Sequence, residues 1–183
     1  SSTPRASNSV KPNPVDEMTA NLDQLRSRAH KLFIALLWAH VPLVCMVSWL
    51  VGGPVVPLTA MTFVCASVAT AGWLMSSRQV AVRVTNAVAL MGVVSLLLAA
   101  MSGHRWQVDI HMYYFAAVAL VAIYCDPIAI IAAAATVAVH HLSLNFLLPA
   151  AIYPGGSDFG RVVLHAVILI LESGGLVWMT FVL

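Results

Sequence analysis

The stretch PIAIIAAAATVAVHHLSLNFLL, residues 127–148, contains no Asp, Glu, Lys or Arg, yet it carries two adjacent histidines, His140 and His141. A helix that crosses a bilayer needs about 20 predominantly apolar residues. The stretch therefore predicts a transmembrane helix with two imidazoles at membrane depth. Of the 183 residues of the chain, 61% are hydrophobic and 9% are charged, whereas a soluble domain has about 25% charged residues. We therefore expect an integral membrane protein.

Six apolar segments of similar length follow one another along the chain. Because backbone within a bilayer must satisfy its own hydrogen bonds, each segment is expected to be a helix. Helix-breaking residues separate them; Asp126, before Pro127, is predicted to cap the fifth helix and Asp158 the sixth. The predicted fold class is all-α, a bundle of six transmembrane helices over residues 31–51, 55–76, 80–102, 109–125, 127–148 and 161–183.

The sequence before the first span divides into two parts. Residues 1–15 are rich in Ser, Pro and Asn and are predicted to be disordered. Residues 16–30 are predicted to form a cytoplasmic amphipathic helix that leads into the membrane domain, 31–183. Lys and Arg are concentrated before the first span and between the second and third, which predicts that both termini are cytoplasmic. The net charge of +2 gives no indication of nucleic-acid binding, and we expect a cytoplasmic output domain after the last span.

Seven ionisable side chains are predicted to lie within the spans, where charge is costly and usually serves a function. At a rise of about 1.5 Å per residue, four of them lie near the bilayer midplane and three nearer the outer surface. They come from the first, fourth, fifth and sixth spans, which predicts a single site in the bundle core. The midplane layer is His40, His140, His141 and Glu172, and the outer layer is Asp109, His111 and His165.

These side chains form a donor set rich in imidazole. Such sets favour transition metals over Mg or Ca, so we predict Fe, Cu or Zn, as one ion or as a dinuclear pair. Haem b, clamped between two histidines of facing helices, is the alternative cofactor. Asn145, four residues after His141, is predicted to orient that imidazole from outside the ligand set. A purely structural or proton-relay network of the same side chains also remains open.

Five motifs carry a family resemblance: LLWAHVP at 36–42, DIHMYYF at 109–115, LVAIYCDP at 120–127, AVHHLSLNFLLPA at 138–150 and LHAVILILES at 164–173. With these motifs the chain resembles the six-helix, histidine-rich membrane input module of bacterial methyl-accepting chemotaxis proteins. The same module occurs in some diguanylate cyclases and histidine kinases. Many members of that family have histidine where this chain has Asp109.

The resemblance implies a sensory function rather than an enzymatic one. It implies a homodimeric, multi-pass protein of the bacterial inner membrane, whose buried metal or haem responds to oxygen, redox state or metal. A displacement of the last helix against the first would then reach the output domain. Two other functions remain open from the residues alone, a membrane metal-dependent oxidoreductase and a metal or proton transporter. The predicted polar groups stop near the midplane, which argues against a path across the membrane.

Overall fold

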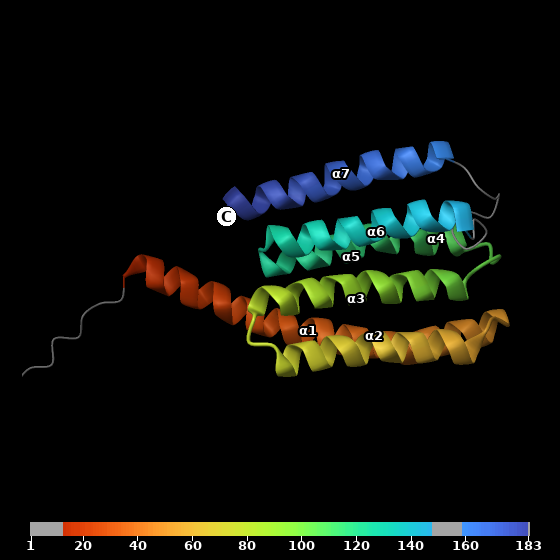
Figure 1. Ribbon diagram of the computed structural model, residues 1–183, viewed down its shortest axis with the longest axis horizontal. Helices are drawn as coiled ribbons and strands as arrows, with labels where there is room; N and C mark the ends of the chain where they lie inside the picture. Colours follow the sequence, from red (N-terminus) through yellow and green to blue (C-terminus); the bar gives the residue numbers. More distant parts are fainter. Residues whose placement is uncertain (1–12, 148–158, 183) are drawn as a thin grey trace, which may run out of the picture.

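The computed structural model describes residues 13–147 and 159–182 (Figure 1). Within those residues every regular element is helical, and six helices or helical units are long and apolar enough to cross a membrane. The predicted all-α architecture with six such helices is therefore confirmed. The elements are α1 (Pro14–Val51), α2 (Val55–Met75), α3 (Gln79–Ala100), α4 (Gln107–His111), α5 (Tyr113–Val121), the 3₁₀ helix η1 (Ala122–Tyr124), α6 (Pro127–Leu147) and α7 (Phe159–Val182).

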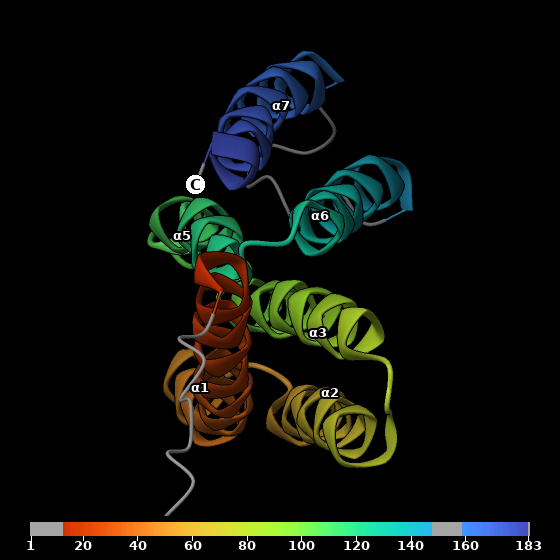
Figure 2. The same ribbon diagram turned by 90° about the vertical axis from the view of Figure 1, so that its left-hand side faces the viewer.

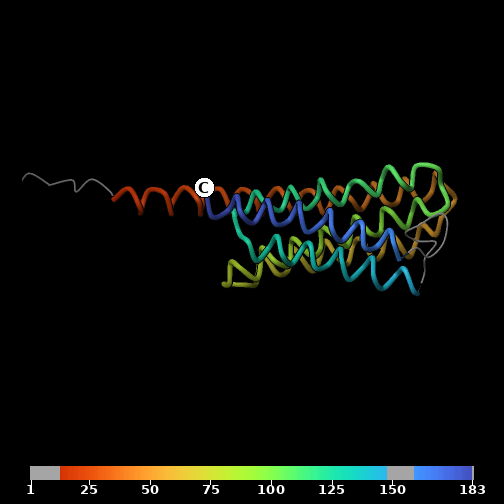
Figure 3. Tube along the Cα trace, turned by 90° about the horizontal axis from the view of Figure 1, so that it is seen from above, coloured from red at the N-terminus to blue at the C-terminus, as the bar shows by residue number. Residues whose placement is uncertain are grey.

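α1 joins two predicted segments into one continuous helix of 38 residues. Asn13 caps its first turn, because Oδ1 of Asn13 accepts the N–H of Val15 at 3.2 Å. Pro14 occupies the first helical position, where a missing N–H costs nothing. The helix thus begins before the predicted start at residue 16 and continues through residue 30 without a break. Its first turns project beyond the other helices as a continuation of the membrane-length part (Figure 1, Figure 3).

We name the two ends of the bundle by α1. The proximal end is the one from which the first turns of α1 project, and the distal end is the one where α1 turns into α2. At the distal end α1 stops at Gly52, whose φ of 77° and ψ of 24° lie in the left-handed region. Its N–H bonds back to the carbonyls of Ser48 and Trp49. Glycine adopts this conformation without the steric cost of a Cβ, which explains the sharp end of the helix.

Replacing Gly52 by alanine is expected to lower the free energy of unfolding by about 1 kcal/mol, because a side chain is strained at positive φ. No atom lies within 4 Å of the added Cβ, so backbone strain is the only source of the loss. Gly175→Ala in α7 is the matched control, since its Cβ also meets nothing within 4 Å. Alanine inside a helix is expected to be neutral or stabilising there. Thermal unfolding in detergent measures both; equal effects would contradict the proposed helix end.

α3 is the central helix of the bundle. It contacts α1 and α2 on one side and α5 and α6 on the other (Figure 2). About half of the residues in the apolar stretch of α3 are buried, whereas α7, at the edge of the bundle, has few buried residues. Leu90, Met91 and Val94 of α3 are fully buried in the main apolar cluster. α3 therefore connects the α1–α2 pair to the helices that carry most of the predicted site residues.

The fourth predicted span, 109–125, is broken rather than continuous. α4 ends at His111, and the N–H of Met112 bonds to the carbonyl of Asp109, three residues back, at 3.1 Å. Such an i to i−3 bond tightens the chain and ends the regular helix. After α5 the chain tightens again into η1 and stops at Cys125, whose φ of 46° is left-handed.

Asp126 caps α6 as the sequence predicted. Its Oδ1 accepts the N–H of Ile128 at 2.9 Å, and Pro127 occupies the first helical position. This pair of residues pre-organises the first turn of α6. The other predicted cap, Asp158, lies outside the described residues.

Candidate functional site

Three histidines from three helices meet in the distal half of the bundle, and we call them the imidazole cluster. His111 ends α4, His141 lies in the last turns of α6, and His165 lies in the second turn of α7. Their ring centroids are 4.8 Å apart for His111 and His141, 5.1 Å for His111 and His165, and 5.8 Å for His141 and His165. His111 and His141 are buried. The structure thus brings together three of the seven predicted ligands, and a fourth, His140, lies next to them with its ring centroid 5.4 Å from that of His141.

Backbone carbonyls orient two rings of the imidazole cluster. Nδ1 of His141 lies 2.9 Å from the carbonyl oxygen of Val137, and Nδ1 of His165 lies 2.7 Å from that of Arg161. A carbonyl only accepts, so each Nδ1 carries the proton and each Nε2 keeps its lone pair. This is the tautomer that metal-binding histidines adopt when the outer nitrogen is hydrogen-bonded. The helix itself, through the residue four positions back, therefore prepares both rings.

His140 and Tyr114 lie beside the imidazole cluster. The ring centroid of His140 is 5.4 Å from that of His141 and 5.8 Å from that of Tyr114. Oγ of Ser95 donates to the carbonyl of Met91 and lies 2.7 Å from the Tyr114 hydroxyl. Because that Oγ has no second proton, it accepts from Tyr114. The Tyr114 oxygen then accepts from Nδ1 of His140 at 3.4 Å, which is a long contact. Tyr114 and His140 are in this way linked to α3.

An apolar cavity of about 270 Å³ adjoins the imidazole cluster. Aromatic and aliphatic side chains make most of its wall, among them Phe115, Leu142, Phe159 and Leu169. The three imidazoles and Tyr114 supply its polar groups. An apolar pocket with a few convergent polar groups is the usual form of a small-ligand or cofactor site. The cluster and its cavity are therefore the candidate site.

The donor chemistry of the imidazole cluster fits a transition-metal ion, while the spacing is that of a hydrogen-bonded pair. The Nε2 atoms of His111 and His141 lie 2.8 Å apart. Two nitrogens at about 2.05 Å from a tetrahedral ion stand about 3.3 Å apart. Accordingly, no group of three His, Cys, Asp or Glu side chains among residues 13–147 and 159–182 is arranged around an ion position. Since Nε2 of His141 keeps its lone pair, Nε2 of His111 carries the proton in this contact. Metal binding would therefore require loss of that proton as well as a ring rotation that moves the two nitrogens apart by about 0.5 Å.

Haem fits this site less well than a single ion. The cavity of about 270 Å³ is smaller than the roughly 300–1,000 Å³ of ordinary small-molecule sites. The contact between the Nε2 atoms of His111 and His141 also leaves no room for a macrocycle between those two rings. The arrangement therefore offers less room for haem than for a single ion.

His40 is held by protein groups away from the imidazole cluster. Its Nδ1 donates to the carbonyl of Leu36 at 2.8 Å, and its Nε2 lies 3.1 Å from the hydroxyl of Tyr113. The two rings stack, with centroids 5.7 Å apart. Both nitrogens of the buried His40 thus have partners, and its contacts join α1 to α5.

The remaining predicted residues occupy separate positions. Asp109 is exposed on α4. Glu172 is half-buried on α7, and its Oε2 is a buried oxygen that has no hydrogen-bond partner among the described residues. Asn145 is buried one turn beyond His141. The Val137 carbonyl accepts from Nδ1 of His141 and orients that ring.

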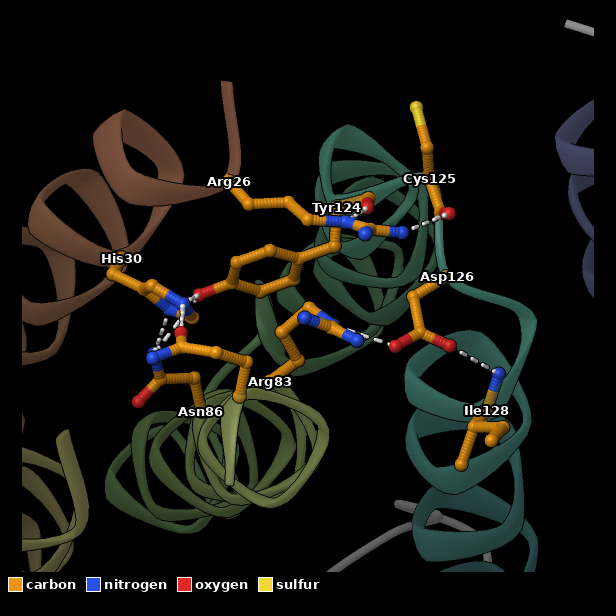
Figure 4. Close-up of polar contacts among 9 residues, drawn as sticks. Arg26, His30, Arg83, Asn86, Tyr124, Cys125, Asp126 and Ile128 are labelled. Atoms are coloured by element: carbon orange, nitrogen blue, oxygen red, sulfur yellow. Dashed lines mark hydrogen bonds and ion pairs between the residues drawn. The ribbon is translucent and has the colours of Figure 1, made fainter. Parts of the chain in front are cut away.

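The sequence analysis missed a second polar network, at the proximal end (Figure 4). Nδ2 of Asn86 donates to the hydroxyl of Tyr124 at 2.9 Å. That hydroxyl lies 3.1 Å from Nδ1 of His30, and Nε2 of His30 lies 3.1 Å from Oε1 of Gln79. Since Oε1 accepts, Nε2 of His30 carries the proton and Nδ1 accepts from Tyr124. The network therefore holds His30 as a neutral imidazole.

Two arginines complete this proximal network (Figure 4). Nε of Arg83 donates to Oδ2 of Asp126, and both side chains are buried. Nε and Nη2 of Arg26 donate to the carbonyls of Tyr124 and Cys125 at 3.0 and 3.1 Å. The available sequence signal was the placement of Arg83 and Asn86 three apart, on one face of α3.

No family model, no curated protein and no solved structure matches this chain. The resemblance to the chemotaxis input module stays a prediction.

Proposed function

We propose that this chain is the membrane-spanning signal-input module of a bacterial inner-membrane receptor, and that its imidazole cluster holds a transition-metal ion. The observation that carries the proposal is the convergence of His111, His141 and His165, from three different helices, with ring centroids 4.8–5.8 Å apart. Ionisable groups at membrane depth are costly, so three of them in contact beside a cavity indicate a function.

The proposal places both termini on the cytoplasmic side. Arg26, Arg28 and Lys31 lie on α1 near the proximal end, and Arg78 precedes α3 at the same end. Positive residues flanking spans favour the cytoplasmic face. The projecting turns of α1 and the end of α7 then both face the cytoplasm, where an output domain would follow.

The residues of the site have defined roles in this proposal. The carbonyls of Val137 and Arg161 fix the rings of His141 and His165 with Nε2 as the ligand atom. His111 provides the third nitrogen from α4, so that occupancy ties α4 to α6 and α7. A bound ion supplies a ligation state that depends on redox state, oxygen or metal supply. The adjoining cavity keeps bulk water away and admits small apolar molecules.

η1 offers a route from the imidazole cluster to the projecting helix. η1 contacts α5, α6, α7 and α1. Arg26 of α1 donates to the carbonyls of Tyr124 and Cys125 at the end of η1. The Tyr124 ring also stacks on Phe33 of α1, with centroids 4.7 Å apart. A shift of α4 and α5 would therefore reach α1 through η1, as well as through α7. This extends the simpler expectation that the last helix moves directly against the first.

A membrane oxidoreductase is the second candidate, and the apolar cavity favours it. A cavity of about 270 Å³ beside a metal could hold the ring of a quinone-like substrate. Catalytic turnover of such a substrate by purified protein, lost together with the metal, would select this function over the sensor.

Elemental analysis with a visible spectrum tests the metal. Protein purified in detergent from cells grown with Fe, Cu and Zn is expected to contain about one of these ions per chain and to lack a Soret band. Dialysis against a chelator, followed by addition of one metal at a time, identifies the preferred ion. A Soret band would identify haem, rather than a directly ligated ion, as the cofactor. Protein that neither retains nor rebinds any metal would contradict the proposal.

A further inference from the structure

A second cavity, of about 360 Å³, lies at the proximal end between α1, the end of α2 and the start of α3. Arg26 and His30 of α1, Trp73 of α2, and Gln79 and Arg83 of α3 line it. Its wall is rich in polar groups, unlike that of the distal cavity, and its volume lies within the roughly 300–1,000 Å³ of small-molecule sites. The proximal network of Figure 4 forms one side of this cavity.

Arg83 brings a buried positive charge to the proximal cavity. Its side chain is 7% exposed, and its Nε donates to Asp126. A guanidinium has five N–H donors arranged in a fork. Among the described residues, the two terminal nitrogens of Arg83 have no hydrogen-bond partner. An acceptor inside the cavity could therefore take charge-assisted hydrogen bonds from these two nitrogens.

Arg26 adds a second guanidinium, and its charge is not matched by a carboxylate. Its partners are the carbonyls of Tyr124 and Cys125, which are dipoles without net charge. Within the described residues, the only ion pair is that of Arg83 with Asp126. Asp23, one turn before Arg26, lines the exposed rim of the same cavity. The cavity therefore presents positive groups inside and a negative group at its entrance.

The formal charges around the cavity sum to zero. Among the lining residues Arg26 and Arg83 are positive, Asp23 is negative, and His30 is neutral by its hydrogen bonds. Asp126 does not line the cavity, but it pairs with Arg83 and neutralises that charge. A ligand with one negative and one positive group matches this arrangement better than a simple anion does. Guanidinium groups bind phosphate oxygens through paired hydrogen bonds. Pockets with basic side chains between transmembrane helices at the cytoplasmic face suit lipid headgroups.

We propose that the proximal cavity binds a phosphoethanolamine headgroup of a membrane lipid. Arg26 and Arg83 donate to its phosphate, Asp23 accepts from its ammonium, and the Trp73 ring lies beside the cavity at the membrane interface. The site does not share residues with the imidazole cluster, so loss of metal would leave it intact. Occupancy would brace α1 against α3 at the point where α1 leaves the bundle.

Native mass spectrometry of the delipidated chain in detergent tests this site. Short-chain phosphatidylethanolamine is titrated alone and in competition with phosphatidylglycerol, phosphatidylcholine and inorganic phosphate. Arg26→Gln is expected to weaken phosphatidylethanolamine binding about tenfold or more, the loss of one charge-assisted hydrogen bond. Arg28→Gln removes the same charge from an exposed position of the same helix and is expected to change binding less than about twofold.

Asp23→Lys is the second variant, chosen because its exposed position makes it tolerant of substitution. It is expected to remove the preference for phosphatidylethanolamine over phosphatidylglycerol while the chain stays folded. Equal losses in Arg26→Gln and Arg28→Gln, or no binding of any phospholipid, would overturn the site. If inorganic phosphate competes as effectively as the lipid, the cavity binds phosphate itself, and the proposal that it binds a lipid headgroup is wrong. An unchanged preference in Asp23→Lys would overturn the role of Asp23.

Discussion

Replacement of His141 by alanine is expected to abolish metal binding, with content falling from about one ion per chain to less than a tenth. His141 is buried and contacts both His111 and His165, and its tautomer is fixed by the Val137 carbonyl. Loss of an outer partner alone usually weakens metal affinity 10–100-fold, so loss of a ligand is expected to exceed that. Elemental analysis of the purified variant after dialysis measures the effect.

Two other histidines serve as controls for His141→Ala. His104 lies in the distal turn between α3 and α4, where its Nδ1 accepts the N–H of Trp106 at 3.2 Å. His40 is buried at 2% exposure but bonds to Leu36 and Tyr113. Alanine at either position is expected to leave metal content unchanged. Circular dichroism and gel filtration verify that each variant is folded; full metal retention by folded His141→Ala would remove the imidazole cluster as the binding site.

The Arg83–Asp126 pair is expected to carry the largest single contribution to stability. Arg83→Met leaves the Asp126 carboxylate, 4% exposed, without its charged partner. Breaking a buried ion pair by removal of one member typically costs about 3–5 kcal/mol. Asp126→Asn should cost a similar amount, and since asparagine is also a good N-cap, the change removes charge without removing the cap of α6. Thermal unfolding in lipid-free detergent measures both variants.

The double variant Arg83→Met with Asp126→Asn tests the origin of that loss. With no charge left at either position, most of the lost free energy of unfolding is expected to return, because a buried pair and a neutral replacement are often nearly equal. Arg28→Met, at an exposed position, is expected to stay within about 0.5 kcal/mol of the parent chain. A double variant as unstable as the sum of the two single ones would show that packing, and not the unpaired charge, determines the effect.

The helical architecture could be predicted because bilayer length and hydrophobicity are properties of local sequence. The helix over 16–30 that leads into the first span was predicted as well, and α1 contains both in one helix. The break at Met112 could not be predicted. The turn at Met112 contains no proline or glycine. It depends on i to i−3 hydrogen bonds, which the types of the surrounding residues do not predict. In α1, the polar and apolar parts both favour a helix, so no residue marks a boundary between them.

The candidate site could be predicted only in part, because the depth of a residue in a span follows from local sequence but the direction of its side chain does not. Counting residues along a span gives depth, and depth alone places His40 beside His141. It does not give the rotation of each helix about its axis, which directs His40 to Tyr113 and leaves Asp109 exposed. Arg83 lies just inside the third predicted span, and its partner Asp126 is 43 positions away in the chain, so no local pattern indicated the pair. Pairings at that separation follow from tertiary packing, which a single sequence does not display.

Pro42 gives the unbroken α1 a mechanical property. Proline cannot donate to the carbonyl four residues back, so α1 bends most easily at this position, beside His40. From there to Pro14 the helix measures about 42 Å. A swing of about 5° around Pro42 would move the far tip by about 4 Å. Because Phe33 and Leu37 of α1 are packed in the main apolar cluster, such a swing also requires repacking of these side chains. In the proposed signal-input function, such a bend would carry an adjustment near His40 to the projecting turns of α1.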